Sequence, residues 1–258
     1  MASLLTELNQ TTTLPTEATY LLPPSYHVKS KTQVELKPTA GDSFSGANSF
    51  IEFKIPNRGY IDPRSIYVEF TCDVVGTELE DVRLYSAHDL FQRMRCYAGN
   101  ATFSDRVGYN RLHRKIEDFT LSDEARGSQK QILEGTSMWP VTRAGTGLGA
   151  VGFDNSVLTT SAAATTAKRH YVIRPDVGVL TSQVNVPAKW FGQPLSLRMY
   201  LEDANEAFHE ILTGAGASTI TSYTLSDVTL VYEELNFGPG FDERMMNRLT
   251  QGGGSYFF

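Results

Sequence analysis

The chain has 258 residues, of which 41% are hydrophobic and 20% are charged, and its net charge is −6. This composition excludes wholesale disorder, and the length suits one large all-β domain or two small ones. The first 26 residues contain neither Lys nor Arg, so a basic arm of the kind that wraps nucleic acid is absent and direct nucleic-acid binding is not expected.

Residues 1–45 are predicted to form an extended N-terminal arm, because several prolines break any helix and the apolar residues show no sustained period. The arm is nevertheless too apolar for a solvated linker. It lies either against a neighbouring subunit or on its own domain. Its candidate subunit contacts are Leu4, Leu5, Leu8, Tyr20, Leu21, Leu22 and Tyr26.

Residues 46–237 are predicted to form an all-β domain, a jelly-roll β-sandwich with one or two short helices in its loops. Alternating apolar and polar residues predict strands over residues 49–55, 64–73, 169–174 and 194–202, and a hairpin over 94–105 with its turn at Gly99-Asn100. The run 222–237 alternates twice, and the slip at Ser226-Asp227 predicts a bulge. Seven or eight strands without alternating βα units favour two packed sheets.

The clearest helix pattern begins at Tyr109, and Leu112, Ile116 and Phe119 follow it at spacings of three and four. A cap at Ser122 predicts a second short helix that runs toward Leu133. The first helix also carries a basic cluster of Arg111, Arg114 and Lys115. Acidic residues flank this cluster, so we interpret it as a solvated helix face or as a charged rim between subunits, in preference to a nucleic-acid site.

Two further segments are poor in core residues. Residues 144–167 are rich in Gly, Ala, Thr and Ser, which predicts a protruding functional loop or a mobile one. Residues 238–258 are predicted to be a C-terminal tail or an interdomain linker, with a short helix over 241–249 and an aromatic end after a triple glycine. In that end, Tyr256, Phe257 and Phe258 are candidate subunit contacts.

The sequence offers no recognisable catalytic, cofactor or metal site. None of its five histidines has the His partner at i+3 or i+4 that zinc sites use, and no nucleophile elbow or phosphate-binding loop occurs. Cys72 and Cys96 lie in apolar runs typical of strands, so we expect them to be free and buried. No run of about 18 apolar residues predicts a transmembrane helix, and the start does not have the pattern of a secretory signal.

Three stretches occur in an order that a known family shares. They are Tyr60-Ile-Asp-Pro-Arg-Ser-Ile-Tyr-Val-Glu-Phe70, then Leu90-Phe-Gln-Arg-Met-Arg-Cys-Tyr-Ala-Gly99 with Asp105 and Tyr109-Asn-Arg-Leu112, and Ser222-Tyr-Thr-Leu-Ser-Asp-Val-Thr-Leu-Val231. Together they resemble the first jelly roll of major capsid proteins of the double-jelly-roll lineage, of the Polinton-like virus and virophage type. The resemblance covers residues 48–237 and brings no catalytic residues with it.

The resemblance implies a non-enveloped icosahedral shell built from vertical jelly rolls. Those relatives carry two jelly rolls in tandem and form pseudo-hexagonal trimers, whereas this chain ends about where a second jelly roll would begin. The chain is therefore a single-jelly-roll capsomer, or a second barrel lies on another chain, or the sequence is a piece of a longer protein.

The leading hypothesis is a structural capsid protein, located in the virion capsid, that forms homo-oligomeric capsomers with its own copies and with other capsid proteins. The alternative is a β-sandwich binding module of carbohydrate-binding or fibre type. Such a module would present Tyr200, Tyr232 and Trp190 on an exposed sheet face. A hydrolase is the third and least favoured alternative, since we expect neither catalysis nor a cofactor.

Overall fold

A computed structural model describes residues 28–46, 49–77, 82–122, 130–135, 165–210, 219–238, 240–244 and 247. The chain divides into two compact units, and the larger one spans residues 31–236. In the smaller unit, residues 240–244 are helical, which agrees with part of the helix predicted over 241–249. There the rings of Phe237 and Phe241 lie 4.4 Å apart.

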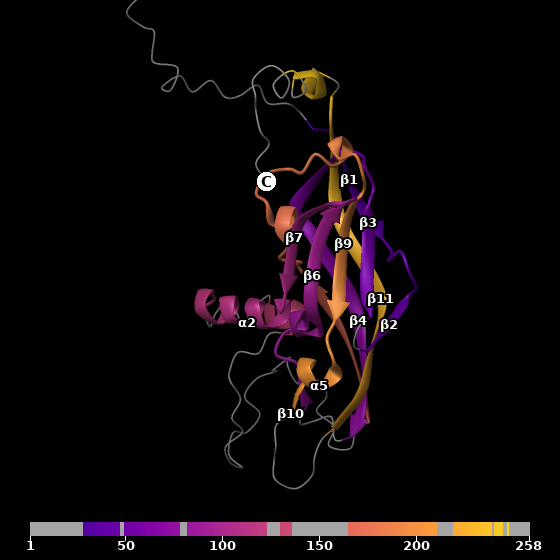
Figure 1. Cartoon of the computed structure of the whole chain (residues 1–258), viewed down its shortest axis with the longest axis vertical. Coiled ribbons are helices and arrows are strands. Elements are labelled where there is room, and N and C mark those ends of the chain that lie inside the picture. The colour runs from indigo at the N-terminus through magenta and orange to yellow at the C-terminus, as the bar shows by residue number, and fades with distance from the viewer. Residues whose placement is uncertain are drawn as a thin grey trace, which may run out of the picture. The chain divides into compact units, whose positions relative to one another are not determined.

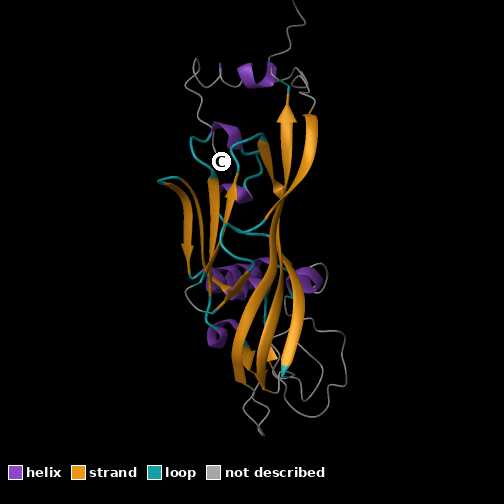
Figure 2. Cartoon of the chain, turned by 90° about the vertical axis from the view of Figure 1, so that its right-hand side faces the viewer, coloured by secondary structure: helices purple, strands orange, loops and turns teal. Residues whose placement is uncertain are grey.

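Two antiparallel sheets form the main layers of the larger unit (Figures 1 and 2). In the first sheet the strands follow the order β1 (Val28–Leu36), β11 (Thr219–Phe237), β4 (Tyr60–Thr77) and β8 (Thr166–Ile173), and β2 (Ser43–Ser45) also pairs with β11. In the second sheet the order is β3 (Phe50–Ile55), β9 (Leu195–Leu201), β6 (Phe91–Ala98) and β7 (Ala101–Val107). Below, these are called the five-stranded and the four-stranded sheet.

The path of the chain confirms the predicted jelly roll. From β3 to β4, from β4 to β6, from β7 to β8, from β8 to β9 and from β9 to β11, the chain passes from one sheet to the other. Repeated crossing between two antiparallel sheets is the connectivity of a jelly-roll sandwich. The predicted hairpin joins β6 and β7 within one sheet, and Gly99 supplies the positive φ of 55° that its turn requires.

Apolar side chains from both sheets fill the space between the layers. Strand β9 shows the alternation that predicted it, because Leu197, Met199 and Leu201 are each 0% exposed. Between the sheets, Phe70 of β4 and Phe91 of β6 meet edge to face, with ring centroids 5.7 Å apart. Tight packing of this kind fixes the register of each strand, since a slip by one residue would turn its apolar set outward.

The longest strands, β4 and β11, pair along most of their lengths. The predicted bulge is confirmed: the pairing register shifts between Ser226 and Thr229, and Asp227 has a positive φ of 54°. The extra residue restores inward burial, because Leu225 before the bulge and Val228 after it are both buried.

Several boundaries differ from the expected ones. Strands β1 and β2 lie within the stretch expected to be an arm, because Val34 and Phe44 are buried there. Strand β4 begins at Tyr60 and β8 at Thr166, earlier than the alternation indicated. The three predicted segments 1–45, 46–237 and 238–258 remain a prediction. Cys72 and Cys96 are free and buried, as expected.

The helices lie in the connections. Helix α2 (Tyr109–Thr120) confirms the predicted helix, and α4 (Gln131–Glu134) falls in the region expected to form the second one. Smaller elements are the 3-10 turns η2 (Ala87–Leu90), η4 (Gly178–Thr181) and η5 (Ala188–Trp190), helix α5 (Ala204–Ala207), and the paired strands β5 (Val82–Arg83) and β10 (His209–Glu210). Most of the Gly/Ala/Thr loop lies outside the described residues.

Candidate assembly surface

Three connections leave the sandwich at the same end. They join β4 to β6, β7 to β8, and β9 to β11, and they include η2, α2, α4 and α5. Two hydrogen bonds connect parts of this end: the Glu202 amide donates to the Leu90 carbonyl (2.9 Å), and the Tyr223 hydroxyl donates to the Glu202 carbonyl (2.5 Å). Figure 1 shows α2 and α5 close together at this end. Loops gathered on a rigid scaffold are the parts of a fold that vary with function.

Helix α2 does not bury its apolar stripe against the sandwich. Of the four residues that predicted the helix, Tyr109 is buried, whereas Leu112 is 44%, Ile116 42% and Phe119 88% exposed. The side that packs on η2 and β6 is polar, with His113 and Glu117 buried. The periodicity therefore identified the helix correctly but did not identify the side that contacts the rest of the chain.

The predicted basic cluster divides among different neighbours. Arg111 lies 3.4 Å from Glu206 of α5 in an exposed ion pair. The guanidinium of Arg114 stacks on the ring of Tyr85, 3.9 Å from its centroid, and Lys115 is exposed. Because pairs of this exposure contribute little to stability, the cluster remains a predicted contact rim. The other candidates (Leu4, Leu5, Leu8, Tyr20, Leu21, Leu22, Tyr26, Tyr256, Phe257 and Phe258) lie outside the described residues.

Beneath α2, two histidines from distant parts of the chain form a buried stack. The rings of His88 and His113 lie 3.7 Å apart, and the Tyr109 hydroxyl lies 2.8 Å from Nδ1 of His88. The Tyr109 hydroxyl also accepts a hydrogen bond from the Asp176 amide (3.4 Å). The stack thus connects η2, α2 and the segment that follows β8.

Charged groups surround the histidine stack. Lys130 donates hydrogen bonds to Glu117 and to Glu134 (3.3 Å), and Glu134 lies 3.6 Å from Nε2 of His88. Burial alone would raise the pKa of Glu134, but the hydrogen bond from His88 and the charge of Lys130 hold that pKa below its usual value. Both carboxylates are therefore engaged with cations, and neither is placed as an unpaired general base.

Burial sets the protonation of two further groups here. It lowers the pKa of His113 to about 2, and the neighbouring His88, Lys130 and Arg106 act in the same direction. It raises the pKa of Asp89 to about 7, against the opposing charge of Arg114. His113 is thus neutral and Asp89 retains its proton up to about neutral pH. A neutral His113 and a protonated Asp89 carry no charge, which suits the buried contact beneath α2.

A cleft of about 670 Å³ opens beside this cluster, between α2 and the connection from β8 to β9. Its walls include Arg64, Arg174 and Asp176, and Asp176 is bonded to Arg106 at 2.6 Å. Within the described part of the chain, no group of three or more His, Cys, Asp or Glu side chains is placed to hold a metal ion. In the same residues, no helix is long and apolar enough to span a membrane.

The aromatic residues proposed for a binding module do not share an exposed platform. Tyr232 is buried at 1% exposure, and Trp190 packs edge to face on Tyr60 at 5.9 Å. The ring of Tyr200 is half-buried beneath the guanidinium of Arg93, at 5.3 Å from the ring centroid. These three side chains therefore do not form the kind of stacking surface that sugar rings need.

Reasoning from the sequence did not identify the histidine stack. The β6–β7 hairpin separates His88 in η2 from His113 in α2, and no regular spacing relates the two histidines. The contact between the two histidine rings depends on how the connection from β4 to β6 packs against α2. The one available hint was that α2 places His113 and Glu117 four residues apart on one side.

No protein-family model matches the chain, and no curated protein matches its sequence. Solved structures do match. A chain of the Sputnik virophage is 10% identical with a TM-score of 0.57, and the match covers 82% of this chain and 49% of that one. The Faustovirus major capsid protein is 13% identical with a TM-score of 0.50, over 95% of this chain and 60% of that one.

The present chain thus spans about half of the Sputnik chain and three fifths of the Faustovirus protein. The match extends over both sheets, since it includes more than four fifths of the present residues. The chain therefore has the fold of the double-jelly-roll lineage of viral major capsid proteins, in the extent of about one half of such a protein.

Proposed function

We propose that this chain is a structural capsid protein that self-assembles, with its own copies and other capsid proteins, into the icosahedral shell of a non-enveloped virus. The observation that carries the proposal is the jelly roll itself, which is similar in structure to part of the Faustovirus major capsid protein. A large loop-bearing end and an apolar helix stripe that the fold leaves exposed suit a protein that acts through contacts with other subunits. The role is structural, not catalytic, and its site is the virion.

The binding-module alternative is less favoured on the positions of its aromatic residues. A glycan platform needs ring faces that are open to solvent, and Tyr232 is in the core while Tyr200 lies under an arginine. A glycan array would detect such a module as distinct hits from a stable monomer. We expect no such hits.

The first test is the mass of the purified full chain by light scattering after gel filtration, with negative-stain images of each peak. We expect rings, closed particles or one defined oligomer, and the order of the oligomer identifies the capsomer. A chain that stays a monodisperse monomer at every concentration would contradict self-assembly.

Deleting residues 1–26 tests the predicted arm. The deletion is expected to impair assembly while the β-sheet circular dichroism remains.

A further inference from the structure

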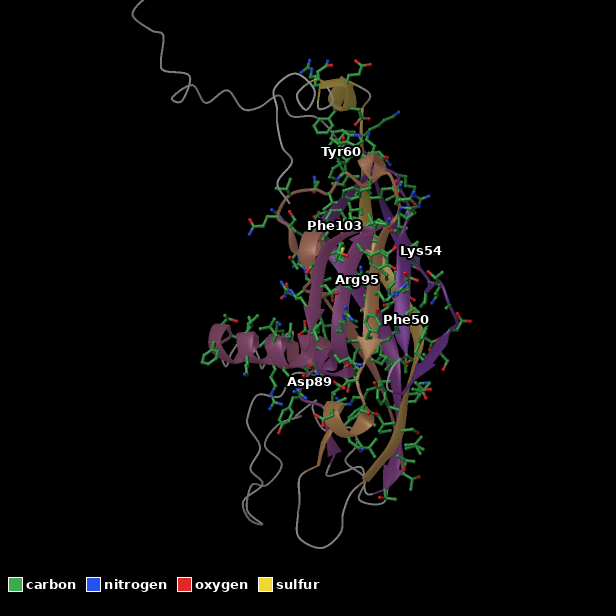
Figure 3. The ribbon with its side chains drawn as sticks, in the orientation of Figure 1. Phe50, Lys54, Tyr60, Asp89, Arg95 and Phe103 are labelled. Carbon is green, nitrogen blue, oxygen red and sulfur yellow. The ribbon has the colours of Figure 1, made fainter. Side chains whose placement is uncertain are left out.

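The outward side of the four-stranded sheet carries a dense set of arginines and aromatic rings, here called the arginine face. Three rows of residues cross its strands in the order β3, β9, β6, β7. The rows are Phe50, Tyr200, Arg93 and Val107; Glu52, Arg198, Arg95 and Asp105; and Lys54, Ser196, Tyr97 and Thr102. Figure 3 labels Phe50, Lys54 and Arg95, one from each row. The opposite side of the same strands faces the core.

On the arginine face, guanidinium groups cover the aromatic rings. Arg198 lies over Phe50 at 4.6 Å from the ring centroid, and Arg95 lies over Tyr97 at 5.0 Å. These are favourable cation–π distances. Because the chain's own arginines occupy these ring faces, the rings are not available to stack on a sugar or a nucleobase.

Hydrogen bonds hold the same arginines in fixed positions. Arg93 donates twice to Asp105, at 2.7 and 2.5 Å, and these bonds hold the pKa of Asp105 below its usual value. Burial works to raise the pKa of Glu52, but hydrogen bonds from Tyr97 and Arg198 outweigh it and lower that pKa. Side chains that are already ordered lose little entropy on binding, and Arg, Tyr and Phe are enriched in protein interfaces.

The arginine face is positive in an otherwise acidic chain. It contains four cations (Arg93, Arg95, Arg198 and Lys54) and two carboxylates (Glu52 and Asp105), a net charge of +2, whereas the whole chain carries −6. Among the described residues, Lys54 has no ion-pair or hydrogen-bond partner. Two copies of this face would repel each other, so a contact with another copy has to use a different surface of that copy.

The outward side of the five-stranded sheet carries charges of both signs, among them two glutamates of β1 and β4. Glu35 of β1 and Glu69 of β4 lie close enough to Tyr67 to raise its pKa, in addition to the effect of burial. Neither glutamate has an ion-pair partner within the part of the chain that the structure describes.

Within residues 31–236, three lysines of this second face already have partners on the same face. Lys31 pairs with Glu233 at 2.6 Å, Lys168 lies 3.6 Å from Asp73, and Lys37 donates to Thr229. Among the described residues of 31–236, the charges that these contacts leave without an ion-pair partner include Lys54 on the arginine face and Glu35 and Glu69 on the opposite side of the sandwich.

We propose that the arginine face of one copy packs on the outward side of the five-stranded sheet of the next copy, with Lys54 and Arg95 opposite Glu35 and Glu69. The inference rests on the proposed capsid function and names the surfaces that its self-assembly uses. Because the contact joins two different surfaces, it propagates from copy to copy and closes into rings or extends into arrays.

The size of the arginine face indicates a contact that is weak in isolation. With about 4.8 Å between strands and 6.8 Å between same-side residues, its twelve positions cover on the order of 400 Å². A standard interface buries about 800 Å² on each partner, so this face supplies roughly half. Stable assembly then depends on ring closure, in which each copy makes two contacts.

The test compares two exposed lysines on opposite sides of the sandwich. Lys54→Glu reverses a charge of the arginine face, and Lys168→Glu makes the same change in net charge on the five-stranded sheet. Assembly of the full chain is followed by light scattering over a concentration series, and thermal melts confirm that each variant is folded. Lys54→Glu is expected to raise the concentration of half-assembly about fivefold or more, and Lys168→Glu to leave it unchanged or to lower it.

A charge swap provides the second measurement. Glu69→Lys alone is expected to weaken assembly, and an equimolar mixture with Lys54→Glu is expected to recover it, because reversed surfaces then meet each other. Equal shifts for the two lysine variants, or a mixture that assembles no better than its components, would overturn the proposed contact and leave the capsid function standing. A wild-type chain that never assembles would overturn both.

Discussion

Strand β9 and helix α2 carry equally regular apolar patterns, but they use them in opposite ways. In β9, Leu197 and Leu201 point into the core and are 0% exposed. In α2, Ile116 and Phe119 point away from the sandwich, and the helix rests on a polar side instead. An apolar stripe indicates which side of an element is favoured to be buried. It does not indicate whether the same chain or another molecule buries that side.

The difference follows from position in the fold. Strand β9 has a neighbouring strand on each edge and a second sheet against one side. Its apolar side is therefore buried against that second sheet. Helix α2 lies in a connection and packs on η2 and β6 along one side. Its buried contacts include the histidine stack and the Glu117–Lys130 ion pair.

The largest expected effect compares the same substitution in both elements. Leu197→Ala removes a fully buried side chain and is expected to lower the free energy of unfolding by about 2–5 kcal/mol. Leu112→Ala, at a position 44% exposed, is expected to cost about 1 kcal/mol or less. Urea denaturation followed by circular dichroism measures both. Equal losses would show that the helix stripe is covered within the chain.

The buried polar residues beneath α2 are expected to make the free energy of unfolding depend on pH. Burial lowers the pKa of His113 to about 2 from 6.5, so its contribution to stability is present above pH 6.5 and is lost as the pH falls. Burial raises the pKa of Asp89 to about 7 from 3.8, so its contribution is present below pH 3.8 and is lost as the pH rises. Between about pH 4 and 6.5 the two dependences have opposite signs and nearly cancel.

Single substitutions separate the two. Asp89→Asn leaves the His113 dependence, so stability is expected to fall by about 1.4 kcal/mol per unit as the pH drops from 6.5 toward 4. His113→Asn leaves the Asp89 dependence, so stability is expected to fall as the pH rises over the same range. Chemical denaturation at half-unit steps of pH measures both slopes, and slopes of the same sign in the two variants would contradict this account.

Two glycines with positive φ provide a third comparison between the layers and the helix. An added Cβ at Gly178, where φ is 52°, would lie 2.8 Å from Cβ of Ser104 in β7, whereas at Gly108, where φ is 67° at the start of α2, it would meet nothing within 4 Å. Gly108→Ala is expected to cost about 1 kcal/mol for the backbone conformation alone. Gly178→Ala adds the overlap and is expected to cost about 2–3 kcal/mol. Thermal melts rank the two.

The smallest effect is expected at the end of α2. Phe119 is 88% exposed, so Phe119→Ser is expected to change the free energy of unfolding by about 0.5 kcal/mol or less. Removing this exposed ring is also expected to raise the solubility limit of the chain, which turbidity measures. A loss of stability comparable to that of Leu197→Ala would show that Phe119 is packed.

Most of the fold could be predicted from local patterns. Alternation located the strands of the four-stranded sheet, and the slip at Ser226-Asp227 located the bulge that the positive φ of Asp227 confirms. These signals are local, because a strand buried on one side has to alternate and a bulge has to interrupt the alternation. Strand β1 was missed because one residue, Val34, is buried among exposed neighbours.

The candidate surfaces could be predicted only in part. The sequence identified the basic residues of α2, but the arginine face depends on the register that aligns Arg95 with Arg198 and Glu52 across three strands. The histidine stack depends on a contact between the turn η2 and the helix α2, and no spacing of residues in the sequence predicts that contact. Long-range register and the docking of connections are tertiary properties, and a single sequence contains no local pattern for them.

The central position of β11 also determines when this protein can finish folding. The strand lies between β1 and β4 in its sheet, yet of the described strands it is the last to be synthesised. At about 5–20 residues per second, a ribosome needs on the order of ten seconds to travel from Thr77 to Phe237. Throughout that interval β1 and β4 have unpaired edges that invite pairing with other nascent chains. We therefore expect the yield of folded chain in the cell to depend on how well those edges are shielded during translation.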